Sequence, residues 1–231
     1  MVAISAEQLG SLRQAVLELA RQTDREETLQ LIAARAVDVV PGCQMAGISM
    51  HTSLRRPSAV ETTAFTSSLA LQADQAQYEL DEGPCLDALR AADTYVISNT
   101  EAESRWPQWA PRAQALGIRS VLSVRLPVPQ DLVGGINLYS KDVGAYDEPA
   151  VHLAHLYAAH AATALELVSE IGGLRTALQR RHAIGMAQGI LMQRFDLDVE
   201  SSFSYLTRQS QQANIKLRDI ADQVIRRRRE L

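Results

Sequence analysis

Apolar residues recur at helical spacing in the first forty positions. They fall at Leu9, Leu12, Val16 and Leu19, and again at Leu29, Ile32, Ala33, Ala36 and Val40. Residues three and four apart share one face of a helix, so the pattern predicts two amphipathic helices. The first lies within residues 1–25 and the second covers Thr28–Val40, where Pro41-Gly42 ends it.

The middle of the chain mixes short β-prone runs with helical runs. The β-prone runs are Ala46–Thr52, Ala59–Thr66, Tyr95–Ser98, Arg119–Pro127 and Val133–Tyr139, and the helical runs are Leu69–Tyr78 and Pro107–Leu116. Two pairs of strands are joined by short links, Ser53–Ser58 and the Pro129-Gln130-Asp131 turn, as in hairpins. We therefore predict an α+β fold with a largely antiparallel sheet whose faces are covered by helices.

A long helical pattern begins after Asp147, which suits an N-cap. Its apolar positions continue past residue 178, and a pattern longer than about 25 residues is typical of a coiled coil. This favours a homodimer with paired helices, and the alternative is a core helix folded back on its own domain. Gly172-Gly173 is its weak point, either a break or a hinge, because each glycine costs about 1 kcal/mol in a helix.

Charge divides the chain unevenly. Residues 174–231 hold eleven Lys/Arg and six Asp/Glu, a net charge of +5. Residues 1–173 hold twelve Lys/Arg and twenty-one Asp/Glu, a net charge of −9, so the whole chain carries −4. The basic portion also carries two short helical patterns, one capped by Asp198 and one beginning near Leu217. A small basic unit beside a larger acidic one indicates that one part meets a polyanion.

Composition narrows the functional classes. No apolar run approaches the ~20 residues that span a bilayer, and the beginning of the sequence has no signal-peptide pattern, so we expect a cytoplasmic protein with no membrane association. Cys43 and Cys85 offer neither a disulfide framework nor metal-ligand spacing, and we expect both to be buried and reduced. No catalytic triad or phosphate loop is visible, which favours a protein that is not an enzyme and needs no metal or cofactor.

The basic portion contains a specific compound motif. It runs Ile184-x-x-Ala187-Gln188-Gly189-Ile190-Leu191-Met192, then Phe203-x-x-Leu206, then Asn214-x-Lys216-Leu217-x-x-x-Ala221. This pattern resembles the ANTAR domain, a three-helix RNA-binding module of bacterial transcription antitermination regulators. The resemblance implies binding to nascent RNA that folds into two stem-loops with six-base loops, and two stem-loops suit two copies of the domain. RNA polymerase is a further partner that the resemblance allows.

The same resemblance implies a set of RNA-binding residues. They are Arg181, Ala187, Gln188, Gly189, Arg194, Arg208, Asn214, Lys216 and Arg218. The small residues Ala187 and Gly189 would allow the RNA to approach the helix closely, and the cations would contact its phosphates or loops. The alternative for each cation is a solvated surface charge, and the alternative for Asn214 is a turn residue. Phe195, Phe203 and Tyr205 occupy positions that suit the core, so no base-stacking surface is expected. Ser201-Ser202 replaces the Glu-Ala that is common in the family.

A second motif lies in the acidic portion. Asp81-Glu82-Gly83-Pro84-Cys85-Leu86-Asp87-Ala88-Leu89, followed by Trp106-Pro107 and Leu116–Ser120, resembles the GAF domain, a sensor of small molecules. The resulting layout is an N-terminal helix (1–25), a GAF-like domain (26–168) and an ANTAR domain (169–231). The resemblance implies a pocket for an unidentified ligand near the first motif, with candidate residues His51, Tyr78, Cys85 and Trp106. Trp106 could instead be plain core, and His51 an exposed strand residue.

Three hypotheses follow for the function. The first is a signal-responsive RNA-binding regulator of transcription antitermination. The second is a DNA-binding regulator, since three small basic helices can also form a helix-turn-helix. The third is a thiol reductase of the GAF type, which Cys43 and Cys85 support poorly because they lack recognisable resolving neighbours.

Overall fold

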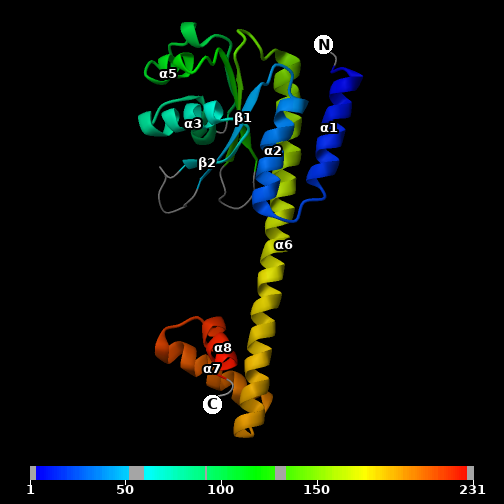
Figure 1. Cartoon of the computed structure of the whole chain (residues 1–231), viewed down its shortest axis with the longest axis vertical. Coiled ribbons are helices and arrows are strands. Elements are labelled where there is room, and N and C mark those ends of the chain that lie inside the picture. The colour runs from blue at the N-terminus through cyan, green and yellow to red at the C-terminus, as the bar shows by residue number, and fades with distance from the viewer. Residues whose placement is uncertain (1–3, 52–59, 92, 128–133, 228–231) are drawn as a thin grey trace. The chain divides into compact units, whose positions relative to one another are not determined.

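The computed structural model describes residues 4–51, 60–91, 93–127 and 134–227 (Figure 1). It separates into two compact units, Met1–Ser169 and Glu170–Leu231. The two links expected at Ser53–Ser58 and Pro129–Asp131 lie outside the described residues. We describe each unit by itself.

The first unit is built on a five-stranded sheet. Its strands are β1 Met45–His51, β2 Val60–Phe65, β3 Tyr95–Ile97, β4 Ser120–Leu126 and β5 Gly134–Ser140. The spatial order is β2-β1-β5-β4-β3, and every neighbouring pair is antiparallel. The prediction of an α+β fold with an antiparallel sheet is confirmed. The central strands β1 and β5 are buried along nearly their whole length, because helices cover both faces.

Helices of this unit lie on opposite faces of the sheet. They are α1 Ala6–Leu19, α2 Arg25–Val39, α3 Ser68–Leu80, α4 Pro84–Ala91, the single 3₁₀ turn η1 Thr100–Ala102, α5 Trp109–Ala115 and the first part of α6 Glu148–Phe195. Figure 1 shows α2 and α6 against one face and α3 and α5 on the other. Two separate apolar clusters fill these layers, one under α2 and α6 and one under α3 and α5.

The α2–α6 face is packed through small and large side chains in alternation. Ala33 and Ala36 of α2 are fully buried, while Leu153 and Tyr157 of α6 supply bulk in the same cluster. The Tyr157 hydroxyl donates to the Ile32 carbonyl at 2.8 Å, so this buried phenol is satisfied. The interior alanines let the helices approach closely.

Helix α1 is part of the first unit. Ser5 caps it with a reciprocal capping box to Gln8, and its buried face, through Leu12 and Leu19, joins the α2–α6 cluster. An ion pair of 2.6 Å between Glu18 and Arg35 also links α1 to α2.

The second unit holds three helices around a small core. The end of α6, α7 Val199–Ala213 and α8 Leu217–Arg226 contribute its buried apolar residues, which are Ala187, Leu191, Leu206, Ile220, Ala221 and Val224. Asp198 caps α7 by accepting from the Ser201 amide at 2.7 Å, as its position predicted. Phe195, which the sequence suggested as a core residue, is instead half exposed.

Helix α6 is unbroken at its two glycines. Residues 172 and 173 are both helical and exposed, and a Cβ added at either position would meet no heavy atom within 4 Å. The Asp147 cap predicted from the sequence is present, since its carboxylate accepts from the Ala150 amide at 3.0 Å. Across the described residues, none of the helices combines the length and apolar character needed to cross a bilayer.

Gly47 of β1 gives a first prediction. A Cβ at this position would lie 2.3 Å from a carboxylate oxygen of the buried Asp74. We expect Gly47→Ala to lower the free energy of unfolding of the first unit by about 1–3 kcal/mol, because the carboxylate must move. Urea unfolding followed by tryptophan fluorescence measures this, since both tryptophans, Trp106 and Trp109, lie in this unit.

The matched control is Gly10→Ala in α1, where a Cβ meets nothing within 4 Å. This change should raise the stability by about 0.5–1 kcal/mol through helix propensity. Equal midpoints for the wild type and Gly47→Ala would contradict the proposed close approach.

Candidate functional site

The Asp81–Leu89 motif forms the junction between α3 and α4. Asp81 ends α3 in the left-handed conformation (φ 50°), and Gly83 adopts φ 147°, which a side chain rarely allows. The Gln77 side chain accepts a hydrogen bond from the Cys85 amide at 2.8 Å and so fixes the start of α4. Glu82 accepts from the Gln108 amide at 2.7 Å, which ties the same junction to the start of α5.

A buried polar cluster lies on the sheet face beneath α3. Its centre is the carboxylate of Asp74, which is fully buried and accepts from Thr62 Oγ1 at 2.9 Å, from Asn137 Nδ2 at 2.7 Å and from the Tyr139 hydroxyl. All three donors are neutral. Asn137 extends the cluster along the sheet, because its Oδ1 accepts from Ser123 Oγ at 2.9 Å.

Two of the predicted pocket residues, Tyr78 and Cys85, belong to this cluster. Both meet at the hydroxyl of Ser49 in β1, which lies 2.6 Å from the Tyr78 hydroxyl and 3.3 Å from Cys85 Sγ. Asn137 also donates to Ser49 Oγ at 2.9 Å. Six elements therefore converge on one buried polar centre, and polar groups placed in this way can orient a small ligand.

The other two pocket candidates lie elsewhere. Trp106 packs edge to face against Tyr95 and Trp109, at 5.6 and 6.3 Å between ring centroids, and its Nε1 donates to Asp87 Oδ2 at 2.9 Å. Trp106 is therefore a core residue of the α5 side. His51 is the last residue of β1, partly exposed and paired with Val60.

Burial shifts the ionisation of this interior. It raises the pKa of Asp74 to about 6, partly offset by the hydrogen bonds from Tyr139, Thr62 and Asn137. Burial likewise raises the pKa of the Cys43 and Cys85 thiols to about 12. Burial thus disfavours the thiolate, which is the nucleophilic form of a cysteine. Among the described residues, no group of three His, Cys, Asp or Glu side chains is placed to hold a metal ion.

The residues carried over from the ANTAR motif divide into a buried set and an exposed set. Ala187 is fully buried in the three-helix core, so its small size lets α7 and α8 pack closely against α6. Its side chain is therefore not available to a ligand at the surface. Gln188 is partly buried, and its Nε2 donates to the Val199 carbonyl at 3.0 Å and to Ser202 Oγ at 3.3 Å. Ala187 therefore lies off the expected RNA surface, and Gln188 ties α6 to α7.

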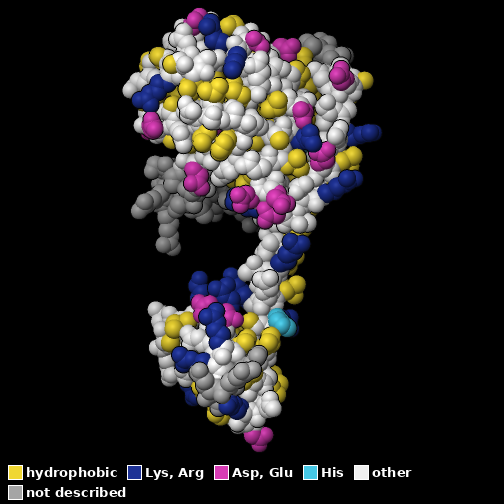
Figure 2. All heavy atoms as spheres, viewed as in Figure 1, with side chains coloured by type: hydrophobic (Ala, Val, Ile, Leu, Met, Phe, Trp, Pro, Cys, Tyr) yellow, Lys and Arg dark blue, Asp and Glu magenta, His cyan; other side chains and the backbone are white. Residues whose placement is uncertain are grey.

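The remaining candidates are exposed. They are Arg181, Gly189, Arg194, Arg208, Asn214, Lys216 and Arg218. Arg218 pairs with Asp219 at 3.1 Å, and the Arg208 guanidinium lies 5.8 Å from the centroid of the Tyr205 ring. Asn214 ends α7 in the left-handed conformation (φ 53°), which is the turn role considered for it. Figure 2 shows Lys and Arg side chains, with apolar ones between them, over the surface of this unit.

Sequence reasoning missed most of the buried cluster. Asp74, Asn137, Ser49, Ser123 and Thr62 belong to no motif, and each looks like an ordinary polar residue of a strand or helix. Only the apolar neighbours of Ser49, Ser123 and Asn137 in β1, β4 and β5, which are buried on both faces, hinted that polar groups there must pair with one another.

Asp74 generates a prediction for the dependence of stability on pH. Its pKa is about 6 in the folded protein and 3.8 in an unperturbed aspartate, so the folded state binds the proton more tightly. The resulting stabilisation is fully present below about pH 4 and is lost as the pH rises through 6. Asp74→Asn keeps an acceptor for Asn137 and Tyr139 and removes the titration.

We therefore expect the stability of the wild type to fall relative to Asp74→Asn by up to about 3 kcal/mol between pH 4 and 7. Denaturant unfolding at five pH values measures the difference. Glu61→Gln, an exposed change in β2, serves as the control and should follow the wild type. Parallel curves for the wild type and Asp74→Asn would show that this carboxyl does not titrate with folding.

Solved structures share the fold of the first unit at low sequence identity. The GAF domain of a phosphoenolpyruvate-protein phosphotransferase from Coxiella burnetii is 14% identical, with a TM-score of 0.56 over 72% of this chain and 97% of that one. The free methionine-R-sulfoxide reductase from Neisseria meningitidis, solved with its substrate, is 20% identical, with a TM-score of 0.53 over 76% and 97%. A bacteriophytochrome from R. palustris is 11% identical, with a TM-score of 0.63 over 90% of this chain and 47% of that one.

Family models describe both units. Among curated proteins, no sequence matches the chain. The model of the ANTAR domain matches residues 173–225, and the model of the GAF domain matches residues 22–166. Because the GAF match covers more than half of the 231 residues, the chain belongs to the GAF domain family, and it carries an ANTAR domain after the GAF domain.

Proposed function

We propose that this protein is a signal-responsive regulator that binds paired stem-loops in nascent RNA and thereby promotes transcription antitermination. The observation that carries the proposal is the ANTAR match over the basic three-helix unit. A GAF sensor joined to an ANTAR domain supports a regulator, not an enzyme, and the raised thiol pKa of Cys85 argues in the same direction. Because nascent RNA is the target, the protein would act in the cytoplasm.

The charge of the ANTAR unit supports a polyanionic partner. Residues 174–231 have a balance of +5, and cations that the structure describes are exposed, including Arg181 of α6, Arg208 of α7 and Lys216 at the start of α8. Phosphate contacts of this kind position a protein on nucleic acid and provide much of the affinity, without reading sequence. A folded stem-loop presents such phosphates at fixed spacing, which suits recognition by shape.

We further propose that two copies of the chain act together, with RNA polymerase as a partner of the RNA-bound dimer. Leu174 and Leu178 lie one turn apart on α6, and each is about two thirds exposed. Large aliphatic side chains at this spacing form the seam of a coiled coil. A dimer would hold two ANTAR domains, one for each stem-loop.

The buried cluster of the GAF domain supplies the sensing part of the proposal. An unidentified small ligand would bind near Ser49, Tyr78 and Cys85, whose polar atoms already converge. Such a ligand can regulate RNA binding only if it has different affinities for two states of the protein.

RNA binding is tested with a two-stem-loop RNA and a DNA duplex of the same sequence. We expect the purified chain to shift the RNA in a gel and to prefer it over the duplex. Arg181→Gln and Lys216→Gln should each weaken binding several-fold and reduce the slope of log affinity against log salt by about 1, since each removes one phosphate contact. Arg25→Gln, an exposed change in α2, is the matched control and should leave binding unchanged. Preference for the duplex would favour a DNA-binding regulator instead.

The dimer is tested by light scattering. We expect the mass of the wild type to be that of two chains and the mass of Leu174→Asp/Leu178→Asp to be that of one, because buried carboxylates oppose pairing of the helices. Gln179→Asp, on an exposed position of the same helix, should remain dimeric. A monomeric wild type would remove the dimer from the proposal.

A further inference from the structure

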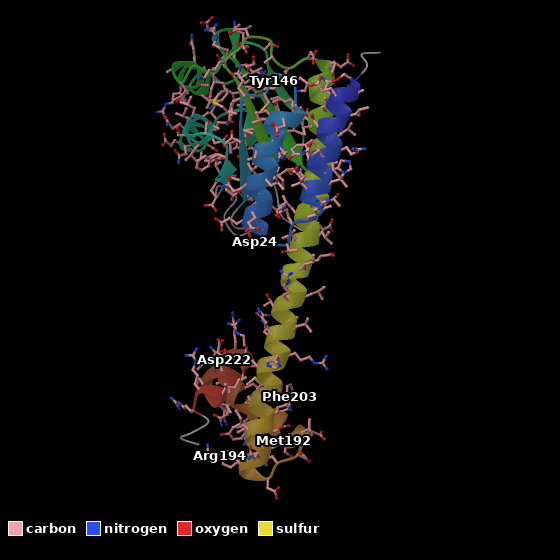
Figure 3. All side chains as sticks on the ribbon, turned by 45° about the vertical axis from the view of Figure 1, so that its right-hand side comes forward. Asp24, Tyr146, Met192, Arg194, Phe203 and Asp222 are labelled. Carbon is pink, nitrogen blue, oxygen red and sulfur yellow. The ribbon has the colours of Figure 1, made fainter. Side chains whose placement is uncertain are left out.

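The ANTAR unit exposes two aromatic side chains that its sequence placed in the core, together with an aliphatic one. Phe195 is 50% exposed, Phe203 is 45% exposed and Val199 is 63% exposed. Aromatic rings are among the side chains that gain most from burial, so two half-exposed phenylalanines in a unit of about sixty residues are a notable feature. Figure 3 labels Phe203 on α7 together with Met192 and Arg194 of α6.

The position of Phe203 is held firmly by its neighbours. Ser202, the preceding residue, is fully buried, and its hydroxyl donates to the Val199 carbonyl at 2.8 Å. The Gln188 amide donates to Ser202 Oγ and to the same carbonyl, which fixes the first turns of α7 against α6. Val199 and Phe203 are four residues apart and share one face of α7. The ring of Phe203 is therefore presented outward from an anchored segment.

The charge of the ANTAR unit indicates what would cover the exposed face of Val199 and Phe203. Cationic side chains lie exposed on α6 and α7 and at the start of α8, among them Arg194, which precedes Phe195 in the sequence, and Arg208, five residues after Phe203 on α7. A second copy of the unit would bring another excess of positive charge against it. A nucleic acid combines phosphates with flat apolar bases, and unpaired bases are recognised by stacking on aromatic side chains.

We propose that Phe203, with Val199 on the same face of α7, forms a stacking surface for unpaired bases of the RNA loops. This inference rests on the proposed RNA-binding function and adds to it the means by which loop bases are engaged. The cations provide affinity for any folded RNA, whereas the phenyl face requires a base that is free of its stem. Gln188 and Ser202 are positioning residues that hold the phenyl-bearing turn in place.

The experiment uses the full chain and a two-stem-loop RNA with 2-aminopurine at each loop position in turn. We expect protein binding to change the fluorescence of at least one loop position. Phe203→Leu keeps the apolar volume and removes the flat ring, and it should weaken binding about tenfold and abolish that fluorescence change. Phe203→Tyr should retain both. The salt slope should stay as in the wild type for both variants, because no cation is lost.

Phe65→Leu is the matched control, since Phe65 is 39% exposed on β2 of the GAF domain. Its affinity and its fluorescence change should equal those of the wild type. Thermal unfolding of each variant checks that the fold is intact, and a half-exposed ring should contribute little to the midpoint.

The possible failures are distinct. If Phe203→Leu binds RNA as tightly as the wild type, and no loop position changes its 2-aminopurine fluorescence on binding, the stacking surface is overturned. The proposed function would remain in that case. A wild type that binds no stem-loop RNA would overturn both. A drop in mass for Phe203→Leu without RNA would identify the face as a contact between copies and would also overturn the inference.

Discussion

Helix α6 must satisfy two hydrophobic cores that are far apart in its sequence. Leu153 and Tyr157 lie in the core of the GAF domain, and Ala187 and Leu191 lie in the core of the ANTAR domain. Most α6 side chains from 169 to 182 are exposed. A helical stretch without a buried face is marginal in water, and two glycines weaken it further. Its helical state thus depends on the cores that flank it and, in the proposed dimer, on a partner helix.

The interior of the GAF domain holds a buried polar cluster whose members are hydrogen-bonded to one another. Asp74 is satisfied by neutral donors, and Ser49 is shared by Tyr78, Cys85 and Asn137. A ligand that enters this cluster must replace the hydrogen bonds that it breaks, since an unsatisfied buried polar group costs about 1–3 kcal/mol. In the proposed function, that requirement would make the site selective for ligands with matching polar groups. It also explains Gly47, because the carboxylate occupies the space of a side chain there.

The ANTAR unit separates two physical tasks. In the proposed function, the exposed arginines and lysine would attract any folded RNA through its phosphates, and the outward-facing Phe203 would distinguish a loop with unstacked bases from a closed helix. Gln188 takes part in neither directly. Its hydrogen bonds to Val199 and Ser202 hold α7 against α6, and the serine of this chain provides an acceptor that an alanine would lack.

Local patterns in the sequence were sufficient to predict the helices and strands, the antiparallel sheet, the cap at Asp147 and the two domain families. They were sufficient because periodicity, turn residues and motifs each depend on a few neighbouring positions. The same reasoning grouped Tyr78 and Cys85, which do meet in the buried polar cluster, but it grouped Trp106 with them, which belongs to the core, and it expected Ala187 on a surface, where it is buried. Phe195 and Phe203 were expected inside and lie outside, because helical spacing marks a face without saying which face the neighbouring helices cover. Tertiary structure alone brought Asp74, Ser49 and Asn137 together, since residues up to 88 positions apart meet only when β1, β5 and α3 pack against one another.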